Sequence, residues 1–163
     1  MDEAVFTRTA KAYKDRLFAI AFHYCRSRAD AEDILQTVLL KYYRSEKEFG
    51  TEEYLRNWLI RVTINESKRL LLSHWRRRTV PLEELEEYAA QTLPIPEESE
   101  LFLAVLALPQ KYRIVVHLYY YEEYSVREIA DLLAIRETTV QTRLMRARAK
   151  LREKLKEAWN NEE

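Results

Sequence analysis

Seven polar side chains lie between residues 136 and 146, and their types are those that recognise nucleic acids. Threonine hydroxyls, a glutamine amide and arginine guanidinium groups can bond to base edges and to phosphates. An apolar series at helical spacing, Val140, Leu144 and Ala147, runs through the same stretch. The polar groups are therefore expected on the outer face of one helix that contacts DNA. They are Arg136, Thr138, Thr139, Gln141, Thr142, Arg143 and Arg146.

The segment before this helix predicts a helix-turn-helix. Ser125 and Glu128 form an S-x-x-E capping box, in which each side chain satisfies a free backbone amide at the helix start. Residues 126–133 carry one apolar face, and residues 134–136 interrupt it before the polar helix begins. This spacing fits two helices that cross at a steep angle through a short turn. A solvated amphipathic hairpin is the alternative explanation of the same pattern.

The N-terminal half predicts three helices. Apolar residues recur every three or four positions from Phe6 to Tyr24. Asp30 is placed to cap a second helix that runs to about Arg44. A third helix is expected over about Glu53 to Trp75. With one glycine, four prolines and 33% charged residues in 163, the chain is expected to be almost entirely helical.

The outer side of the second helix combines carboxylates with apolar groups. Such a mixture is unusual for a purely solvated face and typical of a protein interface. Acidic residues near a helix start also interact favourably with the helix dipole, so both explanations stay open here. The residues on this side are Glu32, Asp33, Gln36, Leu39, Leu40 and Tyr43.

Charge is segregated along the chain although the formal net charge is zero. Residues 56–78 hold seven basic side chains and one acidic one, and residues 134–156 hold eight basic and two acidic. Between these basic blocks, residues 79–103 hold seven glutamates, three prolines and no lysine or arginine. The pattern predicts two separate contacts with a polyanion and a domain boundary in the acidic segment.

The residues that enzymes and metal sites need are scarce. Cys25 is the only cysteine, Gly50 is the only glycine, and the three histidines lack metal-ligand spacing. We therefore expect no catalytic residue, no metal, no cofactor and no small-molecule substrate. The sequence shows no signal peptide and no apolar run of about 18 residues, from which we expect a cytoplasmic protein.

Four motifs appear in order along the chain. Residues 30–36 read DAEDILQ, residues 58–65 read WLIRVTIN, residues 108–113 read LPQKYR, and residues 128–148 contain EIA followed by TVQTRLMRAR. With these motifs, the whole chain resembles a bacterial RNA polymerase sigma factor of the extracytoplasmic-function (ECF, group IV) class. The resemblance implies an all-α fold with sigma region 2 in residues 1–78, an acidic linker in 79–99, and sigma region 4 in 100–163.

The resemblance also implies a role for each motif in transcription initiation. The chain is expected to bind core RNA polymerase and to direct it to promoters through their −10 and −35 elements. An anti-sigma factor, often membrane-anchored in this class, is an expected further partner. The polymerase-binding candidates are Asp30, Glu32, Asp33, Gln36, Leu39 and Leu40. The −10 candidates are Arg61, Asn65, Lys68, Arg69, Arg76, Arg77 and Arg78, with Asn65 expected at an extruded base. The −35 candidates are the seven residues between 136 and 146.

Three finer expectations accompany these roles. Trp58 is expected in the core rather than against a base. Arg146, Arg148 and Lys150 are expected at phosphates, which position a protein on DNA without specifying sequence. Arg69 departs from the family, which often has Asp or Asn there, and so leaves the −10 sequence open.

Two other classes of protein remain as alternatives. One is an autonomous helix-turn-helix regulator, which would bind duplex DNA tightly without polymerase. The other is a helical adaptor without a nucleic-acid role, for which DNA binding would be weak and insensitive to salt.

Overall fold

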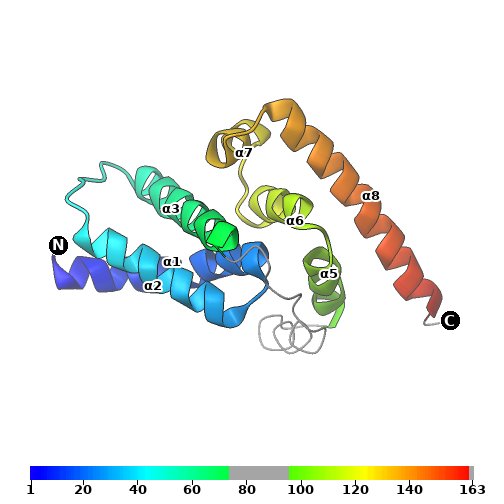
Figure 1. Ribbon diagram of the computed structural model, residues 1–163, viewed down its shortest axis with the longest axis horizontal. Coiled ribbons are helices and arrows are strands. Elements are labelled where there is room, and N and C mark those ends of the chain that lie inside the picture. The colour runs from blue at the N-terminus through cyan, green and yellow to red at the C-terminus, as the bar shows by residue number, and fades with distance from the viewer. Residues whose placement is uncertain (74–95, 162–163) are drawn as a thin grey trace. The chain divides into compact units, whose positions relative to one another are not determined.

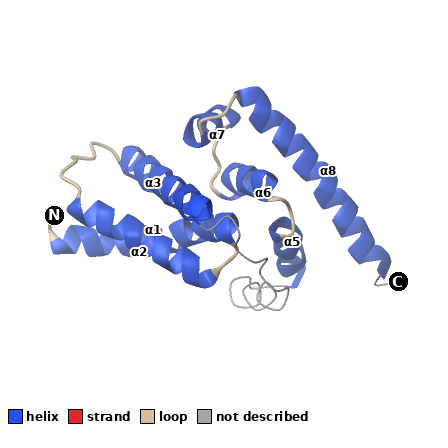
Figure 2. Ribbon diagram, in the orientation of Figure 1, coloured by secondary structure: helices blue, strands red, loops and turns tan. Residues whose placement is uncertain are grey.

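The computed structural model describes residues 1–73 and 96–161 of the chain (Figure 1). The chain divides into two compact units, Met1–Arg78 and Thr79–Glu163. Within the described residues every regular element is a helix (Figure 2), which confirms the predicted all-α class. His74 and the basic run from Arg76 to Arg78 lie outside the described residues.

The first unit is a bundle of three helices, α1 (Glu3–Cys25), α2 (Arg28–Arg44) and α3 (Glu52–Ser73). Each of the three packs against the other two. The predicted apolar face of α1 is confirmed in its central part, where Leu17 and Ile20 are fully buried. Because each helix buries one face, α2 and α3 each present their opposite face outward.

The start of α2 corrects the sequence prediction. Asp30 is not the capping residue; Ser27 is, and its hydroxyl accepts a hydrogen bond from the Asp30 amide at 3.2 Å. The physical reason lies in the preceding turn. Arg26 has a left-handed conformation (φ 52°) that ends α1 and leaves Ser27 extended at the cap position. Asp30 therefore falls in the first turn of α2, where its charge still favours the helix dipole.

The second unit contains α5 (Pro96–Leu106), α6 (Gln110–Val116), a π-helical turn η1 (His117–Tyr121), α7 (Val126–Leu133) and α8 (Glu137–Asn161). The long α8 packs against α5, α6 and α7. Helix α5 begins within the range predicted as linker, residues 79–99. Proline is well suited to the first position of a helix, since its missing amide hydrogen would have no partner there.

The predicted helix-turn-helix is confirmed. Ser125 and Glu128 make both hydrogen bonds of the capping box, each at 3.1 Å. Ala134 ends α7 in the left-handed conformation (φ 56°, ψ 46°), and its amide donates back to carbonyls of the helix. Helix α8 then begins at Glu137 and buries Val140, Leu144 and Ala147.

Candidate nucleic-acid and protein interfaces

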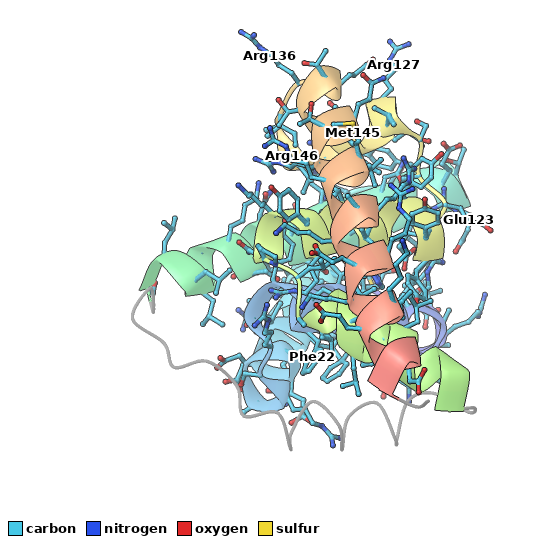
Figure 3. The ribbon with its side chains drawn as sticks, turned by 90° about the vertical axis from the view of Figure 1, so that its right-hand side faces the viewer. Phe22, Glu123, Arg127, Arg136, Met145 and Arg146 are labelled. Carbon is cyan, nitrogen blue, oxygen red and sulfur yellow. The ribbon has the colours of Figure 1, made fainter. Side chains whose placement is uncertain are left out.

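A hollow of about 320 Å³ lies beside the polar face of α8. Five of the seven predicted −35 residues line this hollow: Thr138, Thr139, Thr142, Arg143 and Arg146. The other two, Arg136 and Gln141, are exposed and are not among its lining residues. Figure 3 shows Arg136 projecting from the N-terminal end of α8 and Arg146 projecting from its flank.

Two further residues complete the wall of this hollow, and sequence reasoning did not assign them a site. Lys111 and Tyr112 come from the first turn of α6. The Lys111 ammonium lies 5.1 Å from the centroid of the Tyr112 ring, and Lys150 of α8 lies 6.0 Å from it. The motif LPQKYR placed both residues at a domain start, but it carries no signal that α6 borders α8.

The outer face of α3 carries the described −10 candidates. Arg61, Asn65 and Arg69 are exposed and follow each other at intervals of four residues, so they form one stripe along the helix. Lys68 is half-buried beside this stripe.

Glu66 connects α3 to α2 through two cations. Its side chain is buried, and it forms ion pairs with Lys41 of α2 and with Arg69, whose Nη2 lies 3.3 Å from Glu66 Oε2. The carboxylate therefore compensates part of the positive charge at this end of the stripe.

The outer face of α2 carries the predicted polymerase-binding residues. Glu32, Gln36 and Leu40 are exposed and recur every four residues along one side of the helix, with Asp33 exposed next to them. Leu39 and Asp30 are half-buried. Leu40 is 47% exposed and Tyr43 is 45% exposed, which is a large apolar exposure for neighbouring turns of one helix.

Trp58 is half-buried in an aromatic cluster of the first unit. The centroid of its ring lies 5.3 Å from that of Phe49 and 6.3 Å from that of Tyr42, and the Lys47 ammonium lies 6.0 Å from it. These contacts favour the structural role expected for Trp58.

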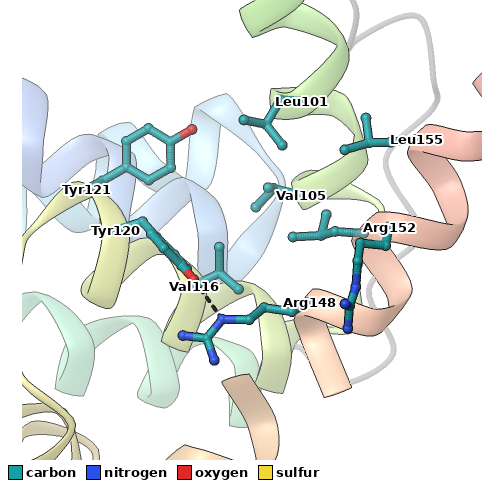
Figure 4. A pocket seen from close by; sticks show the side chains of 9 residues that line it. Leu101, Val105, Val116, Tyr120, Tyr121, Arg148, Arg152 and Leu155 are labelled. Atoms are coloured by element: carbon teal, nitrogen blue, oxygen red, sulfur yellow. Dashed lines mark hydrogen bonds between the residues drawn. The ribbon is translucent and has the colours of Figure 1, made fainter. Parts of the chain in front are cut away.

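A second hollow of about 460 Å³ lies between α5, η1 and the C-terminal half of α8 (Figure 4). Leu101 and Val105 of α5 line it together with Leu155 of α8. The Arg148 Nε donates a hydrogen bond to the Tyr120 hydroxyl at 2.7 Å, so this arginine lies at the hollow rather than beside Arg146. Open apolar surfaces of this kind are typical of contacts with proteins. A sequence signal existed, because the apolar series of α8 continues to Leu151 and Leu155, which stay only half-buried.

Within residues 1–73 and 96–161 no three or more histidine, cysteine, aspartate or glutamate side chains gather as a metal-ligand group. His23 and His117 are buried in different units. In that same part of the chain, every helix is too short or too polar to cross a membrane.

Comparisons with known proteins assign both units to one class. The family model for Sigma-70 region 2 matches residues 9–77, and the model for Sigma-70, region 4 matches residues 99–151. The fold and both matches define a sigma-70-type protein that contains these two regions.

The individual relatives show to which class of sigma-70-type proteins the chain belongs. The chain is 28% identical to the ECF RNA polymerase sigma factor SigM of Mycobacterium tuberculosis over 150 residues, which cover 92% of this chain and 76% of that protein. It is 27% identical to the ECF RNA polymerase sigma factor SigW of Bacillus subtilis, covering 96% of this chain and 91% of SigW. The chain belongs to the ECF class of sigma factors, which are transcription initiation factors that direct RNA polymerase to promoters.

Two solved structures share the fold. The sigma factor RpoE in complex with the anti-sigma factor NepR from Bartonella quintana matches with a TM-score of 0.70 at 21% identity, covering 93% of this chain and 96% of that one. CnrH in complex with the cytosolic domain of CnrY matches with a TM-score of 0.66 at 22% identity, covering 95% of this chain and 90% of CnrH. These two structures show the fold, and the two family-model matches together with the ECF relatives confirm the family resemblance drawn from the four motifs.

Proposed function

We propose that the chain binds core RNA polymerase through α2 and contacts promoter DNA through α3 at the −10 element and α8 at the −35 element. The observation that carries this proposal is the polar face of α8, which follows a capped α7 and a short turn and is open to solvent over its first turns. A recognition helix of this kind enters the major groove with its N-terminal residues at the base edges. The corresponding domains are residues 1–78 and 100–163, joined by residues 79–99.

The −10 contact is assigned to the stripe on α3. Arginine side chains along one helix face can follow a phosphate backbone, and an exposed amide such as Asn65 can bond to the edge of an extruded base. From the sequence alone, we also assign Arg76, Arg77 and Arg78 to the −10 contact. Arg69 contributes less than its charge suggests, because Glu66 pairs with it.

The polymerase contact is assigned to α2. Its exposed acids Glu32 and Asp33 are followed by Gln36 and by exposed Leu40, so charge and apolar surface occur on one face. Such a combination supports a protein partner, since the apolar groups gain from burial and the charges fix the orientation.

An anti-sigma factor is the further partner we propose. Two structures with this fold are complexes, one with the anti-sigma factor NepR and one with the cytosolic domain of CnrY. The exposed apolar side chains of Leu40 and Tyr43 suit such a partner. We place the protein in the cytoplasm, where core polymerase and promoters are. Catalysis of RNA synthesis is assigned to the polymerase, and this chain requires no cofactor and no metal.

The test is run-off transcription with bacterial core polymerase on a pool of promoter fragments. We expect transcripts from defined start sites only when the chain is added. Asp33→Arg should abolish both core binding and transcription, because it reverses an exposed charge on the outer face of α2. Asp15→Arg is the matched control, since it makes the same change at an exposed position of α1 and should leave activity near wild type.

The result that would contradict this proposal is specific binding to linear duplex DNA by the chain alone, with no rescue of initiation by core polymerase. That outcome would favour an autonomous regulator. An unchanged activity of Asp33→Arg, with transcription intact, would contradict only the assignment of α2.

A further inference from the structure

The hollow beside α8 is strongly basic and is built from two elements. Lys111 of α6 lines it together with Arg143 and Arg146 of α8, and three threonines and Tyr112 complete its lining. None of these seven described lining residues is acidic. Positive side chains that lie close together repel one another, and a bound anion relieves this repulsion. The hollow therefore favours a negatively charged group.

Tyr112 brings the cations of this site together. Only 6% of the residue is exposed, and the Lys111 and Lys150 ammonium groups lie 5.1 and 6.0 Å from its ring centroid. Both distances allow a cation–π attraction. Burial acts to raise the pKa of the Tyr112 phenol, but hydrogen bonding and charge from Arg146 together with Lys111 lower this pKa overall. The Tyr112 ring thus lies next to ammonium groups from both α6 and α8, and Arg146 lines the same hollow.

We propose that Lys111 and Arg146 hold one backbone phosphate of the −35 duplex, and that Tyr112 is the positioning residue for both cations. This inference rests on the proposed entry of α8 into the major groove. It extends the −35 surface beyond the helix-turn-helix, because Lys111 and Tyr112 precede α7 by more than ten residues.

A phosphate fits this site better than a base edge does. Phosphates line the border of the groove, and a side chain from a helix next to the recognition helix reaches that border before it reaches a base. Lysine presents three donors around a compact charge, whereas base recognition favours bidentate groups. The threonine hydroxyls of the hollow can donate to further oxygens of the same phosphate.

The consequence is a contact that is independent of sequence. It should contribute affinity equally on every promoter variant that keeps the duplex. It should also contribute to the salt dependence, since each neutralised phosphate releases condensed counterions.

The first experiment measures promoter binding by the holoenzyme of core polymerase and the full chain at several salt concentrations. We expect Lys111→Gln to weaken binding about tenfold and to reduce the slope of log K against log salt by about 0.9. The loss should be the same on fragments with single base changes in the −35 element. Lys14→Gln is the matched control, because it removes the same charge from an exposed position of α1, outside both basic blocks, and it should change binding less than twofold.

The second experiment locates the phosphate. Each phosphate around the −35 element is replaced in turn by an uncharged methylphosphonate. One position should weaken the wild-type holoenzyme and have no further effect on Lys111→Gln. Tyr112→Phe, which keeps the ring and removes the oxygen, should lose part of the affinity at that same position with the helical content unchanged.

Two results would overturn the inference: a salt slope for Lys111→Gln equal to that of Lys14→Gln, or methylphosphonate effects that add to Lys111→Gln at every position. These failures differ from failure of the proposed function. If the proposed function failed, promoter binding by the wild-type holoenzyme would itself not depend on the −35 element. That failure would be visible without any variant.

Discussion

Tyr13 and Glu52 form a single contact that joins α1 to the first turn of α3. The Tyr13 hydroxyl donates a hydrogen bond to Glu52 Oε1 at 2.6 Å. Burial, this hydrogen bond and the charge of Glu52 raise the pKa of Tyr13 to about 12. Because the folded state holds this proton more tightly than the unfolded chain does, the bond stabilises the protein fully below pH of about 10 and loses that effect as the pH rises to 12.

Tyr13→Phe should therefore lower the free energy of unfolding by about 1.5–3 kcal/mol at pH 8, the size typical of a hydrogen bond to a charged group. The difference from wild type should shrink between pH 10 and 12. Denaturant titrations at several pH values measure it. Tyr43→Phe is the control, since Tyr43 is 45% exposed. A deficit of Tyr13→Phe that stays constant up to pH 12 would contradict the role assigned to this bond.

Single residues also show where sequence reasoning was sufficient. The capping box at Ser125 was predictable because it depends on residues three apart, whose geometry is fixed by the helix itself. The cap of α2 was not, because it depends on the conformation of Arg26, an arginine at φ 52°. Ala134 adopts a similar conformation at the turn before α8, although glycine is the residue that adopts it most readily. Left-handed non-glycine residues leave no composition signal.

At the scale of elements, the corner between α5 and α6 depends on a buried arginine. Arg113 is 2% exposed, and its Nη1 donates to the carbonyl oxygens of Leu108 at 3.0 Å and Leu106 at 3.4 Å. These carbonyls lie at the end of α5 and just after it, where helical partners are lacking. Arg113, in the middle of α6, thus donates hydrogen bonds to carbonyl groups at the end of α5.

Arg113→Met should destabilise the second unit by about 3 kcal/mol, because it leaves buried carbonyl groups without a donor. Amide hydrogen exchange should show the loss first in α5 and α6. Arg127→Met is the control, as this arginine is exposed on α7 and projects outward in Figure 3. Equal exchange rates of α5 and α6 in both variants would show that Arg113 does not support this corner.

Helix positions and outer faces were predictable, but contacts between elements distant in sequence were not. Periodicity showed which side of α8 is polar, yet it could not place Lys111 beside that side, because no local rule determines which helix α6 borders. The same limit applies to Glu66, whose pairing with Lys41 depends on how α2 and α3 pack. The apolar series of α8 continues to Leu151 and Leu155, but periodicity could not show that these residues form one wall of an open hollow.

At the scale of the whole molecule, the net charge of zero conceals two basic blocks in two separate units. A uniform mixture of the same charges would interact weakly with DNA, since attraction and repulsion would cancel within a Debye length of about 10 Å. Segregation lets each unit contact the phosphate backbone on its own, while the seven glutamates of residues 79–103 offset part of the positive charge of the two blocks. Affinity for a promoter should then depend on two contacts that are linked by one chain.

This arrangement predicts that losses in the two units add. Arg61→Gln on α3 and Arg143→Gln on α8 should each weaken holoenzyme binding to a promoter by about 1–3 kcal/mol, and the double variant should equal their sum within about 0.5 kcal/mol, because distant sites act independently. On a fragment whose −35 element is scrambled, Arg143→Gln should lose most of its effect and Arg61→Gln should keep its own. If scrambling the −35 element instead removed the effect of Arg61→Gln, the two blocks would serve a single DNA site. Two separate promoter contacts would then no longer explain why the basic residues are segregated into two blocks. Contacts of the chain with polymerase would have to explain it.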